Sequence, residues 1–241
     1  MKAIYFTRGR AKEYCECAIN IYTGCDHGCT YCYGASVLHM TREKFANPVT
    51  RNNLINSIKK EAPAFKGKEV QLCFVTDPYQ VFDQEVRLTR EVIEVLHESG
   101  VKVSILTKGG NRSLVDFDLF EKNPSLSKYG TTLTFLDEAK SLEWEPGAAP
   151  PEERINALQK AKEIGVETWV SLEPVLDPQA VYSIIERTHT FVDMFKVGTW
   201  NYHEDAKKID WKLFGTTAKE LMDHLGCNYY LKNDLVEKMN G

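Results

Sequence analysis

The chain has 241 residues, of which 43% are hydrophobic and 27% are charged, a composition typical of a soluble globular domain. Its formal net charge of −4 argues against broad, non-specific binding to a nucleic-acid backbone, but not against a narrow site for one nucleotide. We find no signal-peptide pattern and no apolar run long enough to span a membrane, so no membrane partner is expected. The seven cysteines then favour a reducing compartment, the cytoplasm.

In chain order, apolar and β-branched runs predict six strands, most of them separated by helical stretches. The strands are expected over residues 18–23, 69–76, 101–107, 130–136, 166–173 and 191–198. Apolar strands that alternate with helices predict a parallel sheet covered by helices. Six such units predict an α/β fold of the partial (β/α)6 TIM-like barrel type in a single domain. Its open side would admit a substrate.

Helix boundaries support this alternation. Gly100 and Gly165 each follow a helical pattern and precede a strand, where a glycine accepts the left-handed conformation that stops a helix. Pro151 suits the first turn of another helix. We therefore divide the chain into an N-terminal extension over 1–17, the barrel over 18–225 and a C-terminal closing element over 226–241.

Polar residues gather where the predicted strands end. The sequences TDPYQ, TKGG, TFLD, EPVLD and GTWN close or follow the second to the sixth strand. In parallel α/β barrels, the carboxyl ends of the strands carry the ligand chemistry. The stretch YTGCDHGCTYCYG, residues 22–34, follows the first strand and belongs to the same edge.

Three cysteines in that stretch, Cys25, Cys29 and Cys32, have the spacing C-x3-C-x2-C. Three thiolates are one short of a closed zinc site and of the four ligands of a [4Fe–4S] cluster. With three cysteines, one iron of the cluster stays open and can bind a small molecule through an amine and a carboxylate. A structural zinc site would instead need His27 or Cys17 as a fourth ligand.

The remaining cysteines give a weaker pattern. A second cluster built on the pair Cys15 and Cys17 would have to recruit Cys73 and Cys227, which are isolated in the sequence. Burial without reactivity is the default for a residue such as Cys73. The sequence leaves the roles of these four cysteines open.

The cysteine spacing, with Tyr31 before the third cysteine, resembles the signature of the radical S-adenosylmethionine (SAM) enzymes. The stretches NIYTGCDHGCTYCYG, VTDPYQ, ILTKG and EPGAAPPEERINAL resemble the branch that contains spore photoproduct lyase and its shorter DNA repair photolyase-like relatives, over about residues 17–177. The resemblance implies a partial barrel with a [4Fe–4S] cluster that reductively cleaves SAM to a 5′-deoxyadenosyl radical. It also implies an electron donor such as flavodoxin or ferredoxin.

The resemblance further implies roles for individual residues. The metal ligands would be Cys25, Cys29 and Cys32. The SAM-binding residues would be Tyr31 near the adenine, Thr76 and Asp77 at the amino group, Lys108 at the carboxylate, and Thr132 or Thr134 at the ribose. The candidate catalytic residues are Tyr31, Tyr33 and Glu173, with Asn201, Trp200 and His203 as weaker candidates. Glu173 ends an apolar strand and could hold a substrate amine or hydroxyl.

One position departs from spore photoproduct lyase, which uses a cysteine as its hydrogen-atom donor. Phe74 stands at the corresponding position, and strand alternation points the neighbouring Cys73 to the other face of the sheet. Tyr31 and Tyr33 could relay a hydrogen atom instead.

The sequence therefore favours a radical SAM enzyme of the lyase or isomerase type. Its substrate would be a small molecule or a nucleotide, such as a modified pyrimidine or a base in DNA, which is rearranged or cleaved. A spore photoproduct lyase-like DNA repair enzyme is the alternative, which the acidic charge and Phe74 disfavour. A metal-stabilised binding protein without turnover is a second alternative, and reductive cleavage of SAM distinguishes it from an enzyme.

Overall fold

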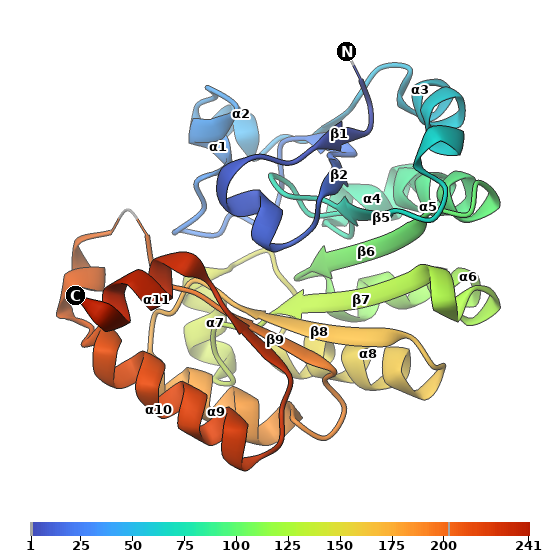
Figure 1. The fold of residues 1–241 in the computed structure, drawn as a ribbon. Helices are drawn as coiled ribbons and strands as arrows, with labels where there is room; N and C mark the ends of the chain where they lie inside the picture. Colours follow the sequence, from blue (N-terminus) through green and yellow to red (C-terminus); the bar gives the residue numbers. More distant parts are fainter. Residues whose placement is uncertain (1, 202) are drawn as a thin grey trace.

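The computed structural model describes residues 2–201 and 203–241, and within them a curved eight-stranded sheet is covered by helices on its outer side (Figure 1). The strand order is β1-β2-β5-β6-β7-β8-β9-β10, and every neighbouring pair is parallel except β1 with β2. The strands β3 and β4 form a separate antiparallel ribbon. The predicted α/β partial barrel in a single domain is confirmed.

The strands are β1 Tyr5–Phe6, β2 Cys17–Ile19, β3 Tyr22–Thr23, β4 Val49–Thr50, β5 Glu69–Leu72, β6 Lys102–Thr107, β7 Ser127–Thr132, β8 Glu167–Leu172, β9 Met194–Val197 and β10 Tyr229–Leu231. The α-helices are α1 Gly34–Val37, α2 Arg42–Phe45, α3 Leu54–Glu61, α4 Val81–Val86, α5 Leu88–Glu98, α6 Phe117–Lys122, α7 Glu138–Trp144, α8 Pro151–Glu163, α9 Pro178–Thr188, α10 Trp211–His224 and α11 Asn233–Asn240. Short 3-10 helices span Gly9–Glu13, Ala62–Phe65, Gly110–Asp116, Pro124–Leu126 and Glu204–Lys208. Across the described residues, none of the helices combines the length and the apolar character that a membrane span requires.

The predicted helix ends agree with the structure. Pro151 is the first residue of α8, and Gly100 and Gly165 follow α5 and α8 with φ angles of +69° and +80°. These left-handed angles stop both helices and direct the chain into β6 and β8.

The fourth predicted strand, 130–136, is displaced, because β7 spans Ser127–Thr132. The prediction treats Gly130 as the start of a strand, but the structure has it in mid-strand. A β-carbon at Gly130 would lie 2.3 Å from the indole of Trp169 on β8. The glycine is there because the tryptophan fills the space beside it, which is a long-range contact that a local pattern does not reveal.

The first predicted strand, 18–23, divides into two. The strand β2 ends at Ile19, and Tyr22–Thr23 turns away to pair with β4. Between them the Asn20 side chain accepts hydrogen bonds from the backbone N–H groups of Phe74, at 3.0 Å, and Val75, at 3.2 Å. Asn20 thereby connects the chain after β2 to the chain after β5, at the edge where the site lies.

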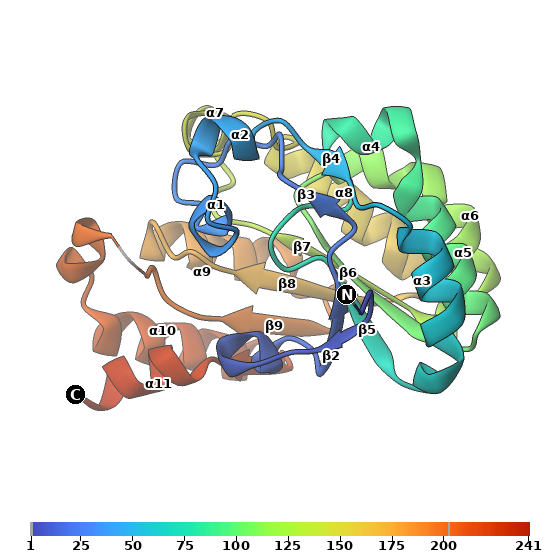
Figure 2. The same cartoon turned by 90° about the horizontal axis from the view of Figure 1, so that it is seen from above.

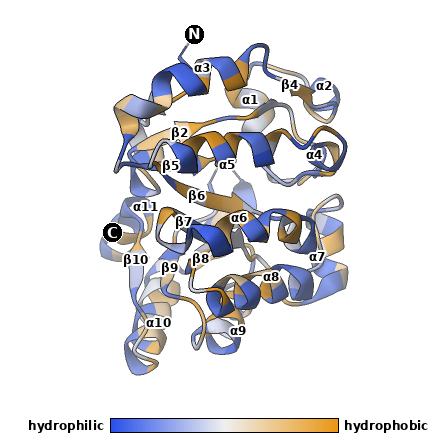
Figure 3. Ribbon diagram, turned by 90° about the vertical axis from the view of Figure 1, so that its right-hand side faces the viewer, coloured by the Kyte–Doolittle hydropathy of each residue, from blue (hydrophilic) through white to orange (hydrophobic). Residues whose placement is uncertain are grey.

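The two faces of the sheet differ in chemistry. On β8, Val170 and Leu172 belong to the main hydrophobic core beneath the helices. Trp169 and Ser171 point the other way, where the Tyr14 ring lies 5.9 Å from the indole and its hydroxyl 3.1 Å from Ser171 Oγ. Figure 3 shows β6 mainly in hydrophobic colour and the covering helices in both colours, as expected of helices with one buried face. The inside of the barrel therefore carries polar and aromatic groups.

The two ends of the chain meet across the open side of the barrel. The 3-10 helix Gly9–Glu13 lies beside β9 and α11 (Figure 2). The Glu13 carboxylate accepts hydrogen bonds from the Asn233 N–H, at 2.8 Å, and the Tyr230 hydroxyl, at 3.1 Å. The N-terminal segment thus crosses the side of the barrel that the sequence predicted to be open.

We expect Gly130→Ala to lower the free energy of unfolding by about 1–3 kcal/mol, because the added methyl group overpacks the space that Trp169 occupies. Urea denaturation followed by circular dichroism would measure this loss. The smaller ring of Trp169→Phe should recover part of it in the double variant. An alanine cost that is the same with tryptophan and with phenylalanine at 169 would contradict the proposed contact.

Candidate functional site

The three cysteines lie in the loop that connects β3 to α1, at the carboxyl edge of the parallel sheet. Cys29 is buried, and Cys25 and Cys32 are half-buried. The Cys25 N–H donates to the Phe45 carbonyl at 2.8 Å, and a β-carbon at the preceding Gly24 would lie 2.6 Å from that same oxygen. Gly24 also has a φ angle of +97°, so only glycine lets the loop approach α2 this closely.

One anchor of this loop is the Arg42 guanidinium on α2. It donates hydrogen bonds to the carbonyl oxygens of Cys29 at 3.0 Å, Thr30 at 2.6 Å and Cys32 at 3.1 Å. These bonds take up the backbone carbonyls of the motif and fix its curvature. Sequence reasoning missed Arg42, because nothing local marks an arginine ten residues beyond Cys32 as its partner.

A second anchor joins the loop to the chain after β5. The Asp26 carboxylate accepts the N–H groups of Val81, at 3.1 Å, and Phe82, at 2.8 Å, at the start of α4. The Asp26 N–H in turn donates to the Gln80 side chain at 3.0 Å. The loop and α4 thereby satisfy each other's otherwise unpaired donors.

The third anchor is His27, which is 2% exposed. Arg112 Nη2 donates to His27 Nε2 at 3.0 Å, so the ring proton sits on Nδ1, which lies 3.5 Å from Asp77 Oδ2. Burial, helped by the nearby Arg112 charge, lowers the pKa of His27 to about 4, so the ring is neutral at pH 7. His27 therefore serves as a structural link between the loop and two side chains outside it, Arg112 and Asp77.

Tyr31 connects the loop to the far side of the site. Its hydroxyl donates to the Glu145 carboxylate, and Arg154 Nη1 lies 2.6 Å from the other Glu145 oxygen. Glu145 and Arg154 are each only 1% exposed. Arg154 also donates to the Thr132 carbonyl at 3.2 Å, at the end of β7. Glu145 and Arg154 stand in the stretch EPGAAPPEERINAL, so the sequence held the signal, but their roles were not predicted.

The predicted SAM-binding residues surround Tyr31. The Lys108 ammonium lies 5.7 Å from the centre of the Tyr31 ring. Burial lowers the pKa of Lys108, but the negative charges at Cys29 and Glu145 outweigh it and the pKa is raised. Burial raises the pKa of the Cys29 thiol to about 11, although Lys108 opposes this.

Two threonine hydroxyls at the carboxyl edge of the sheet make no hydrogen bond among the described residues. They belong to Thr76, after β5, and Thr134, after β7, and both are buried. A buried hydroxyl without a partner costs about 1–3 kcal/mol, which a polar ligand would recover. Together with the Lys108 cation, they fit a ligand that carries a carboxylate and hydroxyl groups, as SAM does.

Asp77 lies at the predicted edge, but protein groups occupy it. Its Oδ1 accepts the Tyr79 N–H at 2.8 Å and the Thr107 hydroxyl at 2.6 Å. Its Oδ2 accepts the Lys108 N–H at 2.7 Å and faces His27. These bonds favour a positioning role for Asp77 over direct contact with SAM.

The other predicted site residues differ in burial and in their partners. Tyr33 is 55% exposed. Trp200 is buried and stacks on His203, with ring centroids 4.2 Å apart, and Asn201 donates to Asp234 at 3.0 Å. Glu173 bonds with Tyr14 and Lys232, two residues that the sequence did not indicate.

The expectation for Cys73 and Phe74 is confirmed. Cys73 belongs to the hydrophobic core and its sulfur accepts the Ile21 N–H at 3.4 Å. Phe74 points to the inside of the barrel, where its ring centroid lies 5.8 Å from that of Tyr14. The inside of the barrel therefore has a phenyl ring at this position, and the thiol is on the other face.

The cysteine, histidine and acidic side chains also indicate which kind of metal site the chain can form. Among the described residues, no three histidine, cysteine or acidic side chains converge tightly enough to hold a single ion. A zinc site would also need a fourth protein ligand, and the two suggested ones are engaged elsewhere, His27 with Arg112 and Cys17 in the hydrophobic core. A four-iron cluster binds each cysteine through a different iron, so it needs the sulfurs further apart.

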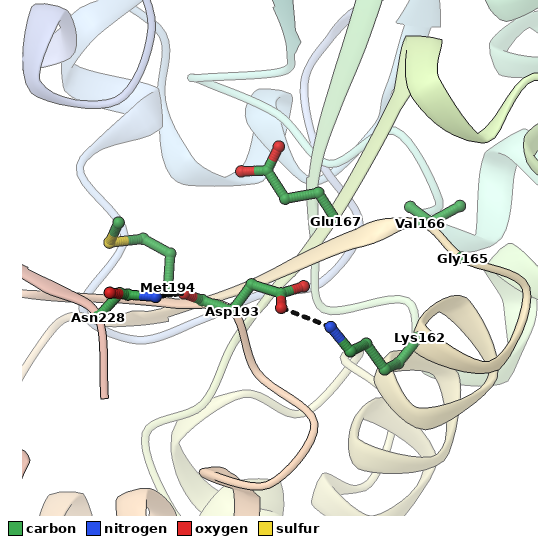
Figure 4. A pocket seen from close by; sticks show the side chains of 7 residues that line it. All are labelled: Lys162, Gly165, Val166, Glu167, Asp193, Met194 and Asn228. Atoms are coloured by element: carbon green, nitrogen blue, oxygen red, sulfur yellow. Dashed lines mark hydrogen bonds and ion pairs between the residues drawn. The ribbon is translucent and has the colours of Figure 1, made fainter. Parts of the chain in front are cut away.

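A separate hollow of about 560 Å³ lies at the amino ends of β8 and β9 (Figure 4). Its lining includes Asn228 and the ion pair of Lys162 with Asp193, whose Nζ and Oδ1 atoms are 2.5 Å apart. Because the strands are parallel, this hollow lies at the end of the sheet opposite to the cysteine loop. It does not belong to the candidate site.

The chain matches known proteins in sequence. The family model described as the radical SAM superfamily matches residues 19–192, well over half of the chain. The chain belongs to the radical SAM superfamily. An uncharacterized protein of Methanocaldococcus jannaschii is 30% identical over 180 residues, 73% of this chain and 67% of the relative. An uncharacterized protein of Acidianus two-tailed virus is 30% identical over 178 residues, 68% of this chain and 57% of the relative.

Solved structures share the fold of this radical SAM protein. A mutant of spore photoproduct lyase aligns with a TM-score of 0.73 at 13% identity, over 94% of this chain and 79% of that chain. SuiB of Streptococcus suis bound to S-adenosylmethionine aligns with a TM-score of 0.67 at 15% identity, over 90% of this chain and 50% of that chain. The cofactors of this family, a [4Fe–4S] cluster and SAM, are those that the sequence predicted.

We expect Arg154→Met to lower the free energy of unfolding by about 3–5 kcal/mol, because it leaves the Glu145 charge buried and uncompensated. Urea denaturation at pH 7 measures the loss. Adding Glu145→Gln to Arg154→Met should recover part of it, since the double variant lacks both charges of the buried pair. A double variant less stable than Arg154→Met alone would contradict this account.

The same pair predicts a dependence on pH. Burial raises the pKa of Glu145, but Arg154 and Lys108 outweigh it and the pKa is lowered. A carboxyl group whose pKa is lowered by folding stabilises the fold above its unfolded pKa of about 4.3 and loses that contribution as the pH falls through its folded pKa. The stability difference between wild type and the Glu145→Gln/Arg154→Met double variant should therefore shrink below about pH 4. A difference that grows on acidification would contradict the ionised pair.

Proposed function

We propose that Cys25, Cys29 and Cys32 bind the [4Fe–4S] cluster through three of its irons. The observation that carries this proposal is the set of three anchors, Arg42, Asp26 and His27, that fix the loop while leaving its thiols unbonded to one another. Metal ligands held by such outer contacts are already arranged before the metal binds.

SAM would bind beside the cluster, between the ends of β5, β6 and β7. Lys108 offers a cation for its carboxylate, and the buried hydroxyls of Thr76 and Thr134 offer partners for its amino group and ribose. Thr132, also buried at the end of β7, is a further candidate for the ribose. The Tyr31 ring, held by Glu145, would lie against the adenine. Asp77 would keep Lys108 in place through its backbone N–H.

When bound, the cluster and SAM would supply the radical chemistry of this superfamily, the abstraction of a hydrogen atom from a substrate held by this chain. We propose that the substrate is a nucleotide or a modified pyrimidine, and that the reaction is a rearrangement or bond cleavage of the lyase or isomerase type. The likeness in fold to spore photoproduct lyase supports this class. The protein would take its electron from a flavodoxin or ferredoxin in the cytoplasm, where its cysteines stay reduced.

A DNA repair enzyme like spore photoproduct lyase is the second candidate. The fold likeness favours it, but Phe74 in place of a thiol on the inside of the barrel and the net charge of −4 argue against it. The Tyr31 hydroxyl is bonded to Glu145, and Tyr33 is exposed beside Cys32, so both tyrosines remain candidates to exchange a hydrogen atom with a substrate.

The first experiment is anaerobic reconstitution with iron and sulfide, followed by dithionite reduction with SAM and chromatography of 5′-deoxyadenosine. We expect the wild type to form deoxyadenosine and Cys29→Ala to form none, because the cluster loses a ligand. Cys227→Ala, a cysteine outside the loop, is the matched control and should keep the activity. Wild-type protein that binds stoichiometric zinc and forms no deoxyadenosine would instead indicate a metal-stabilised binding protein.

We expect Lys108→Met to weaken SAM binding about tenfold, because a charged hydrogen bond to the SAM carboxylate is lost. Calorimetric titration of the reconstituted protein measures this affinity, and the iron content should not change. Lys102→Met, on the same strand at the opposite end, is the matched control. Equal affinities of Lys108→Met and Lys102→Met for SAM would remove Lys108 from the site.

A further inference from the structure

A buried polar corner lies inside the barrel, at the carboxyl end of β8. It is formed by Glu173, Tyr14 and Lys232, which come from the barrel, the N-terminal segment and the C-terminal segment. The Tyr14 hydroxyl and the Lys232 ammonium, the latter at 2.7 Å, both donate to Glu173 Oε2. The Lys232 ammonium also lies 4.4 Å from the centre of the Tyr14 ring. The corner thus brings together three side chains that are distant in sequence.

The two terminal segments hold this corner in place. The Lys196 ammonium on β9 donates to the carbonyl oxygens of Glu13, at 2.8 Å, and Tyr14, at 2.9 Å. The Glu13 carboxylate in turn binds Asn233, next to Lys232. Tyr14 is therefore fixed from both its backbone and its hydroxyl, and it does not behave as part of a loose tail.

The two oxygens of the Glu173 carboxylate differ in their hydrogen bonds. Glu173 Oε1 makes no hydrogen bond within residues 2–201 and 203–241, although its partner oxygen makes two. It lies against Gly198, the residue directly after β9, where a β-carbon would come within 1.7 Å of it. The glycine leaves room for this oxygen, whose hydrogen-bonding capacity is not used by the described residues.

Aromatic rings surround the corner. Tyr14 packs edge-on against Phe74, with centroids 5.8 Å apart, and against Trp169 at 5.9 Å. Tyr14, Phe74 and Glu173 all keep some exposed surface. The corner is therefore lined by aromatic rings on the inside of the barrel.

We propose that Glu173 Oε1 accepts an N–H group on the edge of a nucleobase whose flat ring lies against Phe74, and that Tyr14 and Lys232 are positioning residues for Glu173. The proposal rests on the proposed function and names the group that the site recognises. Carboxylates accept hydrogen bonds from the N–H groups of bases, and proteins that take in a single base commonly combine such a bond with an aromatic wall. A phosphate would be repelled by this carboxylate.

Calorimetric titration of the full-length protein with each of the four 2′-deoxynucleosides, in the presence of SAM, tests the proposal. We expect at least one nucleoside to bind to the wild type. The affinity for that nucleoside should fall at least tenfold in Glu173→Gln. Methylation of the nitrogen that donates to Glu173 should weaken its binding to the wild type by the same factor. Glu167→Gln, at the amino end of the same strand, is the matched control and should bind as wild type does.

Binding that is the same in wild type and Glu173→Gln, or no binding of any nucleoside, would overturn the proposal. Because the readout is binding, this failure is separate from that of the proposed function, which would appear as a lack of deoxyadenosine. If Glu173→Gln alone proves unstable, the variant Glu173→Gln/Lys232→Met removes both charges of the pair, and its nucleoside affinity is read in the same way.

The positioning residues have a pH-dependent signature. Burial and the Asp234 charge raise the pKa of Glu173, while Lys232 and the Tyr14 hydroxyl lower it, and the net pKa is raised. Removing the Lys232 ammonium or the Tyr14 hydroxyl should raise the pKa of Glu173 further. Nucleoside affinity should fall at low pH, where Glu173 becomes protonated. The pH at which the affinity falls should therefore be higher in Lys232→Met and in Tyr14→Phe than in the wild type. The same pH in both variants and in the wild type would show that these residues do not act through Glu173.

Discussion

The Asp77 carboxylate holds together three parts of the chain at the carboxyl edge of the sheet. It accepts bonds from Tyr79, from Thr107 and Lys108 at the end of β6, and it faces His27 in the cysteine loop. Burial raises the pKa of Asp77, but these donors outweigh it and the pKa is lowered. A buried carboxylate is stable only with such partners, so the cysteine loop and Lys108 keep a fixed relation through one side chain.

The opposite side of the loop depends on a second buried charge. Arg154 binds Glu145 and the end of β7, and Glu145 accepts the Tyr31 hydroxyl. The cysteine loop is thus fixed from β6 through Asp77 and from β7 through Arg154. Since both networks are buried and polar, each works only when its hydrogen bonds are complete, which favours a single arrangement of the loop. A loop that must present three ligands in one geometry benefits from this rigidity.

The sequence was sufficient where the signal is local. The cysteine spacing, the glycines after α5 and α8, and the succession of apolar strands and helices predicted the fold and the edge that carries the chemistry. It was insufficient where a residue depends on a distant partner. Tyr14 and Glu173 are 159 residues apart, and Lys232 and Glu173 are 59 apart. For the same reason Gly130 was misread, because its role is set by Trp169 on another strand.

The residues of the proposed site come from the barrel and from the two segments that flank it. The region that matches the superfamily, residues 19–192, contains every residue that we assign to the cluster and to SAM. Tyr14 and Lys232 lie outside it, yet they orient Glu173, which lies inside. The proposed recognition of a base by Glu173 would therefore depend on Tyr14 and Lys232, two side chains outside the region that matches the superfamily.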